Sequence, residues 1–380
     1  MKKLDFNKIY NCILAGAVGD ALGEPIRNMG YDEIIEEYGK NGYTDLKVDS
    51  DDKARITANT QLTIFTIDAL IRAYTKYYIY GITGFGRITS YTSYLRWQHS
   101  QDRETPNSID KQQLEDNYLM EYQELKYERY AEKNIIQILE NEMISEDDIG
   151  YIDNKGYACL TKTAPIGLVF YNNDKVAFEM AVKVAKLTHG HPSAYLSCGV
   201  LAVIIANLAK GEKLEKAIEK GLKMVIRKEE ASEIIEKIKL GIQLSKDNIH
   251  YAEKLDDFGF CDDAHEVLGA AIYIALTFQD NISDALLYSV NNNCYGSNIA
   301  TVVGNILGLY RGIDIRVSEW ARKVELSELY KTLAFDLSSI IKNELPKEID
   351  NFDKDLTVNQ IKYVNDLNIA NWWLVKYDKD

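Results

Sequence analysis

The sequence is poor in proline and shows no cysteine pattern. Only 5 of its 380 residues are proline. Because proline breaks the hydrogen-bond ladder of a helix, this scarcity favours long uninterrupted helices. An odd number of cysteines with no Cys-x-x-Cys pair argues against a disulfide framework and against a zinc site. We therefore expect reduced, mostly buried thiols in a cytoplasmic protein. The cysteines are Cys12, Cys159, Cys198, Cys261 and Cys294.

The sequence also lacks an excess of positive charge and an obvious membrane segment. Its net charge is −14, which argues against binding to nucleic-acid phosphates, since that binding depends on clustered lysine and arginine. Asp5 and Asp20 interrupt the apolar residues near the start, so no signal peptide is expected. No run of about 18 apolar residues is apparent, and we expect no membrane helix.

Helical periodicity dominates what is present. Apolar residues recur on one face of a helix along 62–73, and Asn59 or Thr60 is placed to cap its start. Segments 194–209 and 267–276 are apolar nearly all round, which is typical of buried helices. Further amphipathic helices are predicted over 176–188, 212–227, 229–243 and 317–343, and only 44–48 resembles a short strand. The sequence predicts an all-α protein.

Two regions differ in composition from the rest. Residues 101–150 are rich in Glu, Gln, Lys and Tyr, and we interpret them as a polar, partly helical insertion or lid. From about residue 350, acidic and amide residues alternate with apolar ones up to Trp372 and Trp373. Paired exposed tryptophans are uncommon, so both are expected to dock on the body or on a partner. We expect a helical domain over 1–350 and a docked extension over 351–380.

A polar, glycine-containing loop at 290–296 runs directly into a helix of small residues. This arrangement is typical of a hard metal ion held at a helix start. Between Val290 and Gly308, however, there is no Asp and no Glu. Hard cations such as Mg²⁺ need oxygen ligands that normally include carboxylates. The loop has the frame of a metal site without its charge partners.

Six segments, taken together and in order, resemble one family. They lie at residues 16–25, 56–66, 94–97, 164–168, 188–192 and 290–308. The first reads Gly-Ala-Val-Gly-Asp-Ala-Leu-Gly-Glu-Pro, and the fifth reads Thr-His-Gly-His-Pro. The chain thus resembles the ADP-ribosylglycohydrolase family, which includes the dinitrogenase-reductase-activating glycohydrolase, over about residues 10–312. The resemblance implies a single large orthogonal multi-helix bundle.

The resemblance also implies an activity, which is removal of ADP-ribose from a modified acceptor by two Mg²⁺ ions and an acidic residue. Two close dications need carboxylates to neutralise them. The family's acid position falls on Arg27, so we name no catalytic residue with confidence. We expect no metal site and no cofactor. The family's metal positions fall on Thr57, Ala58, Asn59, Tyr295, Ser297 and Asn298.

Five residues are candidates for ligand binding. Arg27 would replace part of the lost positive charge and hold a phosphate or ribose through its fork of N–H donors. The alternative for Arg27 is an ion pair with Glu24 or a neighbouring acid. By resemblance, His189 contacts bound ADP-ribose, and its alternative is a histidine hydrogen-bonded at a helix start. The full set is Arg27, Asn59, Gly156, His189 and Ser297.

Three functions stay open at this point. The first is a catalytically degenerate member that binds ADP-ribose, an ADP-ribosylated protein or a protein partner. The second is an active ADP-ribosyl-acceptor hydrolase that uses Mg²⁺ with Glu24 and either Asp20 or Asp262. The third is a structural or interaction protein. For Asp20 the alternative role is to brace a loop, and for Asp262 and Asp263 it is to start a helix. The sequence leaves open whether Tyr157 and Tyr295 fill the cleft or line it.

Overall fold

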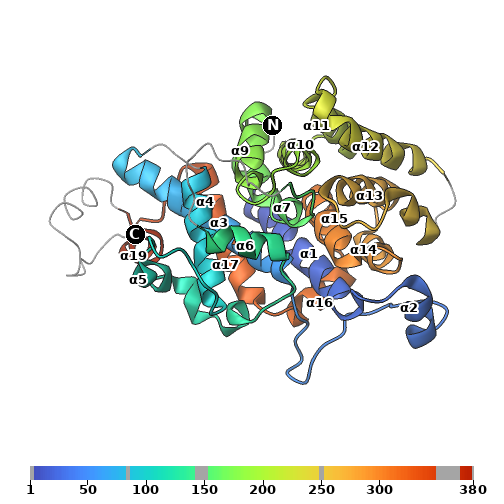
Figure 1. Ribbon diagram of the computed structural model, residues 1–380, viewed down its shortest axis with the longest axis horizontal. Coiled ribbons are helices and arrows are strands. Elements are labelled where there is room, and N and C mark those ends of the chain that lie inside the picture. The colour runs from blue at the N-terminus through green and yellow to red at the C-terminus, as the bar shows by residue number, and fades with distance from the viewer. Residues whose placement is uncertain (1–3, 83–85, 142–152, 248–251, 348–368, 379–380) are drawn as a thin grey trace.

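The computed structural model describes residues 4–82, 86–141, 153–247, 252–347 and 369–378 (Figure 1). Over these residues the chain is helical, with no strand and only two isolated bridges, between Ala54 and Val324 and between Gly156 and Asp263. The all-α prediction is confirmed. The short strand expected at 44–48 is wrong, because this segment runs as irregular backbone between α2 (Tyr31–Tyr38) and α3 (Ala58–Tyr80).

Two helices that are far apart in sequence form the centre of the molecule. They are α1 (Phe6–Gly23) and α15 (Gly296–Tyr310), and their backbones nearly touch. A Cβ added to Gly19 would lie 2.2 Å from the Ala300 carbonyl oxygen, and one added to Gly304 would lie 2.1 Å from the Ala15 carbonyl oxygen. Only glycine permits this approach. The contact places the start of α15 beside the end of α1.

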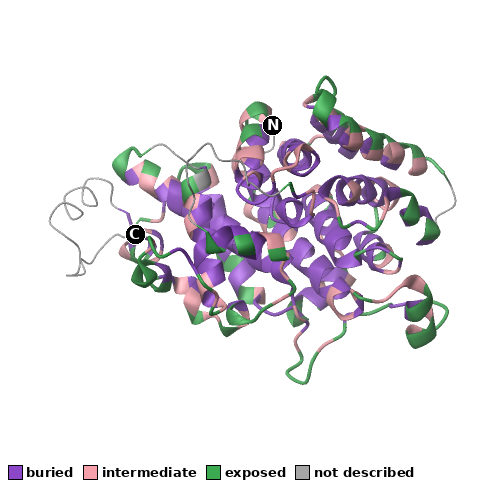
Figure 2. Ribbon diagram, viewed as in Figure 1, coloured by how far each residue is buried: buried purple, intermediate pink, exposed green. Residues whose placement is uncertain are grey.

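The second core helix is α10 (Pro192–Ala209), which has the apolar character expected over 194–209. Contrary to the sequence expectation, it is long and apolar enough to cross a membrane by length and composition. In the fold, however, 89% of that window is buried. Figure 2 shows it among the buried residues, and its neighbours are α9 (Asp174–Ala185), α11 (Leu214–Lys223) and α13 (Ala264–Thr277). Its apolar surface therefore belongs to the protein core.

Several predicted boundaries needed correction. The cap of α3 is Thr57, whose hydroxyl accepts a hydrogen bond from the Asn59 amide at 3.2 Å, so neither Asn59 nor Thr60 caps it. The expected helix over 317–343 is two helices, α16 (Ile315–Lys323) and α17 (Ser327–Lys342). They are separated at Leu326, whose left-handed φ of 63° ends a helical path.

The remaining helices are shorter or lie at the periphery. The α-helices are α4 (Arg87–Ser100), α5 (Lys111–Glu115), α6 (Lys133–Glu140), α7 (Ala158–Thr161), α8 (Ala164–Val169), α12 (Ser232–Leu244), α14 (Ile282–Val290) and α19 (Asn371–Tyr377). The 3-10 turns are η1 (Glu24–Ile26), η2 (Tyr118–Glu121), η3 (Gln123–Lys126), η4 (Glu229–Ala231) and η5 (Ala252–Phe258).

The polar region 101–141 crosses the start of α3. Residues 142–150 of the expected insertion lie outside the described residues. The segment 127–132, which we call the strap, is fixed there by hydrogen bonds to its backbone carbonyls. The Ala58 amide donates to the Arg129 carbonyl at 2.7 Å, and the Gln61 side-chain amide donates to the Tyr127 carbonyl at 3.0 Å. The strap therefore lies against the residues that match the family's metal segment.

The C-terminal helix α19 packs against α3. Trp373 is fully buried and donates from its indole nitrogen to the Thr75 hydroxyl at 2.9 Å. Lys376 forms an ion pair with buried Asp336 of α17 at 2.6 Å. Trp372 is 44% exposed. Only one of the two tryptophans is thus buried in the body.

Candidate functional site

Asp20, near the end of α1, braces the start of α3. Its carboxylate is fully buried and accepts hydrogen bonds from the Thr57 amide at 2.8 Å and from the Thr57 and Thr60 hydroxyls at 2.7 Å each. Burial raises the pKa of Asp20, while the hydrogen bonds from Thr57, Thr60 and Asn59 act in the opposite direction. Both oxygens are engaged, which is the loop-bracing role considered from the sequence.

Asn59 and Asn298 form a closed, neutral contact at the centre of the site. The Asn59 amide nitrogen donates to the Asn298 side-chain oxygen at 3.1 Å. The Asn59 oxygen accepts from the Thr161 hydroxyl at 3.0 Å, and the Asn298 nitrogen donates to the Cys261 carbonyl at 3.4 Å. All of these side chains are buried. Because buried amides are costly to leave unpaired, this arrangement holds α3, α7 and α15 together.

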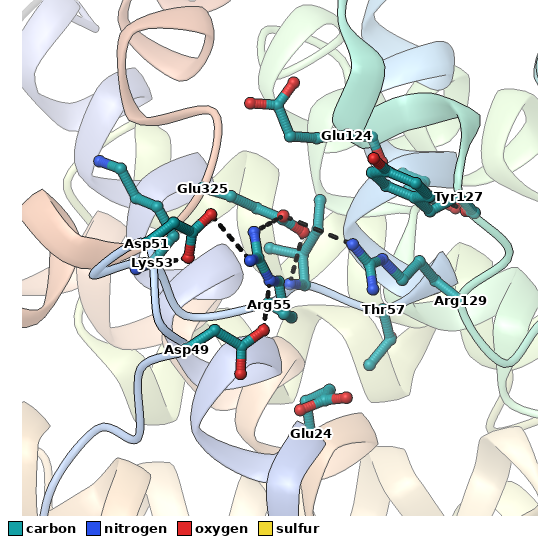
Figure 3. A network of polar contacts seen from close by, with 12 residues as sticks. Glu24, Asp49, Asp51, Lys53, Arg55, Thr57, Glu124, Tyr127, Arg129 and Glu325 are labelled. Carbon is teal, nitrogen blue, oxygen red and sulfur yellow. Dashed lines mark hydrogen bonds and ion pairs between the residues drawn. The ribbon is translucent and has the colours of Figure 1, made fainter.

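A charged network braces the other side of the Thr57 segment (Figure 3). Buried Glu325 accepts a hydrogen bond from the Ile56 amide at 3.0 Å and from Arg55 at 3.2 Å, and it lies 3.6 Å from the Arg129 guanidinium. Burial raises the pKa of Glu325, and the Ile56 amide, Arg129 and Arg55 oppose that effect. Glu325 thereby links the strap to Arg55 and Ile56, which lie just before α3.

Arg27 stacks on an aromatic ring and forms no ion pair with an acid among the described residues. Its guanidinium lies 3.9 Å from the ring centroid of Tyr130, which belongs to the strap. The expected alternative of an ion pair with Glu24 is not seen, and Tyr130 itself donates to Glu24 at 3.5 Å. Within the part of the chain that the structure describes, the buried Nε of Arg27 has no hydrogen-bond partner. Arg27 therefore has an unused donor.

Glu132, at the end of the strap, occupies a cradle of donors that sequence reasoning missed. It accepts from the Ala158 amide at 2.8 Å and from the Asn154 side chain at 3.0 Å, and it lies 3.3 Å from Nε2 of buried His189. A Cβ on Gly156 would lie 2.6 Å from its oxygens. Burial acts to raise the pKa of Glu132, but His189 and the two hydrogen bonds outweigh it, and the pKa is lowered.

The Glu132 cradle accounts for two of the ligand candidates. Gly156 and His189 both contact the protein's own carboxylate, and Nδ1 of His189 shares a hydrogen bond with the Thr188 hydroxyl at 2.8 Å. His191, by contrast, is the N-cap of α10 and accepts from the Ser193 amide at 3.1 Å. No spacing in the sequence connects Glu132 with residues 154–158, because the strap meets them only in the folded chain.

An open pocket of about 430 Å³ lies beside Arg27. Its lining includes Arg27, Met29, Phe260, Asp262, Cys294 and Tyr295. Tyr295 is 38% exposed and lines this space, whereas Tyr157 is buried in the body. Burial raises the pKa of Asp262, and nearby Glu132 and Asp263 raise it further. Asp263 is the N-cap residue of α13. The pocket thus contains a guanidinium, a carboxylate and two aromatic side chains.

A comparison with known families agrees with the sequence motifs. The family model described as ADP-ribosylglycohydrolase matches residues 1–346. The chain belongs to the ADP-ribosylglycohydrolase family. An uncharacterized protein of Archaeoglobus fulgidus is 23% identical over 338 residues, which is 87% of this chain and 95% of that protein. The solved ADP-ribosylglycohydrolase-related protein complex superposes with a TM-score of 0.55 at 18% identity, covering 88% of this chain and 98% of that one. This likeness shows the fold.

The residues at the family's metal positions do not fit a pair of Mg²⁺ ions. Thr57 donates its hydroxyl proton to Asp20, and Ala58 has no side-chain donor atom. Asn59 and Asn298 are hydrogen-bonded to each other. Ser297 lies against Gly23, and Tyr295 lines the pocket. Neutral donors compensate a dication poorly, because Mg²⁺ gives up its waters reluctantly.

Proposed function

We propose that this member of the ADP-ribosylglycohydrolase family binds an ADP-ribose-like ligand, or a protein that carries one, and does not hydrolyse it. The observation that carries the proposal is the buried hydrogen bond between Asn59 and Asn298. These two residues stand at positions where the family resemblance places oxygen ligands for metal. They bind each other instead, and their remaining polar atoms are paired with Asp20, Thr161 and Cys261.

The absence of a carboxylate at these positions supports the non-hydrolytic part of the proposal. A two-metal site stabilises developing charge by bringing dications close together, and carboxylates must hold them. Asp20 is the acid closest to Asn59, at 3.3 Å from its amide nitrogen, and its oxygens already accept five hydrogen bonds. Withdrawing it to a metal would leave the Thr57 and Thr60 donors buried and unpaired, which costs about 1–3 kcal/mol for each group.

Arg27 supports the ligand-binding part. Its guanidinium lies 3.9 Å from the Tyr130 ring centroid and lines the pocket, so it is positioned before any ligand arrives. A guanidinium presented in this way suits a phosphate or a ribose diol, because it forms paired hydrogen bonds in one plane. Phe260 and Tyr295, on the same pocket, offer aromatic faces for a planar base.

Calorimetric titration with ADP-ribose tests the proposal. We expect the same Kd with excess Mg²⁺ and with a chelator, and an affinity about tenfold weaker for Arg27→Ala, the loss of a charge-assisted hydrogen bond. Arg311→Ala is the matched control, because Arg311 also stacks on a tyrosine, Tyr310 at 4.7 Å, but stands apart from the pocket residues. It should bind like the wild type.

Two outcomes would overturn the proposal in different ways. Release of ADP-ribose from a modified protein, stopped by chelating Mg²⁺, would establish the active hydrolase. No heat and no thermal shift with ADP-ribose would leave the structural or protein-partner role, in which the bundle serves only as a scaffold.

A further inference from the structure

Two chain segments form one wall of the Arg27 pocket. The first, residues 259–263, connects η5 to α13, and the second, residues 291–295, connects α14 to α15. The Tyr295 amide donates to the Phe260 carbonyl at 3.2 Å, and the Cys294 thiol donates to the Gly259 carbonyl at 3.3 Å. Since residue 260 is paired with 295, Cys261 lies opposite Cys294. The two thiols interact, because Cys294 raises the pKa of the Cys261 thiol.

Cys261 is held in place by the surrounding turn. Its φ of 55° is left-handed, a conformation that residues other than glycine adopt rarely. The Cys261 amide donates to the Glu266 carboxylate at 3.0 Å, and the Cys261 carbonyl accepts from Asn298 at 3.4 Å. Both of its backbone polar groups are therefore fixed. The backbone of Cys261 is thus held in place next to the segment that contains Cys294.

The two thiols differ in their access to solvent. Cys294 lines the pocket and is 8% exposed, while Cys261 behind it is fully buried. A second pair, Cys159 and Cys198, also interacts, since burial and then Cys198 raise the pKa of Cys159, but both are in the core and neither borders this pocket. The chain thus contains a pair that is reached from the pocket and a matched pair that is not.

We propose that Cys261 and Cys294 are a dithiol modification site, which small-molecule disulfides oxidise to an intramolecular disulfide across the pocket wall. The Cys294 thiolate attacks one sulfur of a disulfide such as oxidised glutathione, and the first glutathione leaves as a thiolate. The Cys261 thiolate then attacks the Cys294 sulfur and releases the second glutathione. Two cysteine protons pass to the two released thiolates, and one disulfide is reduced as one is formed.

The disulfide would join residues 259–263 to residues 291–295 covalently. Phe260 and Tyr295 are the chain neighbours of Cys261 and Cys294, and Phe260 lines the pocket and is 79% exposed. A short cross-link at their bases removes the freedom of these two aromatic side chains to separate. Oxidation would therefore make this wall of the pocket more rigid, whatever ligand the pocket binds.

Peptide mapping of the folded, full-length protein tests the proposal without reference to ligand. After incubation with oxidised glutathione and alkylation of free thiols, we expect a Cys261–Cys294 linked peptide that dithiothreitol abolishes. The pKa of the Cys261 thiol is raised by its hydrogen bond with Cys294 and by burial. Because the thiolate reacts, linkage should form faster at about pH 9 than at about pH 7.

Two variants separate the steps. Cys261→Ala should stop at a glutathione adduct on Cys294, and Cys198→Ala should form the Cys261–Cys294 link at the wild-type rate. Complete alkylation of Cys261 and Cys294 after the incubation would overturn the proposal, and so would a stable wild-type glutathione adduct on Cys294. A link between Cys159 and Cys198 in place of the expected one would show that access from the pocket does not govern the reaction.

Discussion

The Asn59 side chain donates a hydrogen bond to Asn298 at 3.1 Å, and the two residues are 239 positions apart in the sequence. This bond joins the first turn of α3 to the first turn of α15, at the point where the family resemblance places metal ligands. A carboxylate at residue 59 would accept at this point but not donate, and it would stand beside Asp20.

Asn59→Asp should therefore destabilise the protein. The substitution removes the donor to Asn298 and places an unpaired charge next to buried Asp20, at a cost of about 3–5 kcal/mol. Asn59→Ala, which leaves partners unpaired but adds no charge, should cost about 1–3 kcal/mol. Urea unfolding of the wild type and the two variants measures the order of their stabilities. An Asn59→Asp variant as stable as the wild type would show that the site accepts a carboxylate.

Glu132 should contribute to the pH dependence of stability. Its pKa is lowered in the folded protein, so its contribution is present above the unfolded pKa of about 4.3 and is lost as the pH falls through the folded value. Glu132→Gln should flatten the loss of stability below about pH 4.5. Free energies of unfolding across the acid range compare the two proteins. The exposed Glu319→Gln on α16 should reproduce the wild-type curve, and an unchanged curve for Glu132→Gln would contradict the interpretation.

Lys162 should affect the pH dependence of stability in the alkaline range. It is fully buried over the ring of Tyr94 at 4.1 Å, and burial lowers its pKa to about 8. The unfolded chain binds this proton up to a pKa of about 10.4, so stability should rise with pH between these values, by roughly 3 kcal/mol. Lys162→Met should remove the rise and be the more stable protein at neutral pH. A pH profile of Lys162→Met parallel to that of the wild type would refute this.

Tyr130 should matter for ligand binding through its ring. Tyr130→Phe keeps the face on which Arg27 stacks and should bind ADP-ribose as the wild type does. Tyr130→Ala removes it and should weaken binding about fivefold, because a cation–π contact of this kind is worth roughly 1 kcal/mol. Calorimetric titration with ADP-ribose measures the affinity of both variants. Equal loss in both would assign the effect to the hydroxyl bond with Glu24.

The two adjacent tryptophans should differ sharply in their effect on stability. Trp373→Ala creates a buried cavity and removes the indole donor to the Thr75 hydroxyl. It should lower the free energy of unfolding by about 3–5 kcal/mol. Trp372→Ala, at a half-exposed position, should change the free energy of unfolding by about 0.5 kcal/mol or less. Thermal and denaturant unfolding test the pair. Similar losses would mean that α19 docks through both rings.

Periodicity in the sequence predicted the core helices well, because α3, α10 and α13 have patterns that local spacing determines. It failed where a single residue breaks a pattern, as Leu326 does between α16 and α17. It also missed the roles of Glu132 and Tyr130, since their partners are reached only through the fold. The motif match drew attention to Arg27, which lines the pocket, and its role as a ligand-binding residue stays a prediction. The Tyr130 ring on which Arg27 stacks comes from a segment interpreted only as a polar insertion.

The glycine contact between α1 and α15 limits which parts of the site can move. Sliding either helix along the other would drive the Ala15 and Ala300 carbonyls into side chains where now only hydrogen atoms face them. The helices α1 and α15 can therefore move only together. Any adjustment of the pocket to a ligand must come from its two wall segments and from residues 27–30, which also line it.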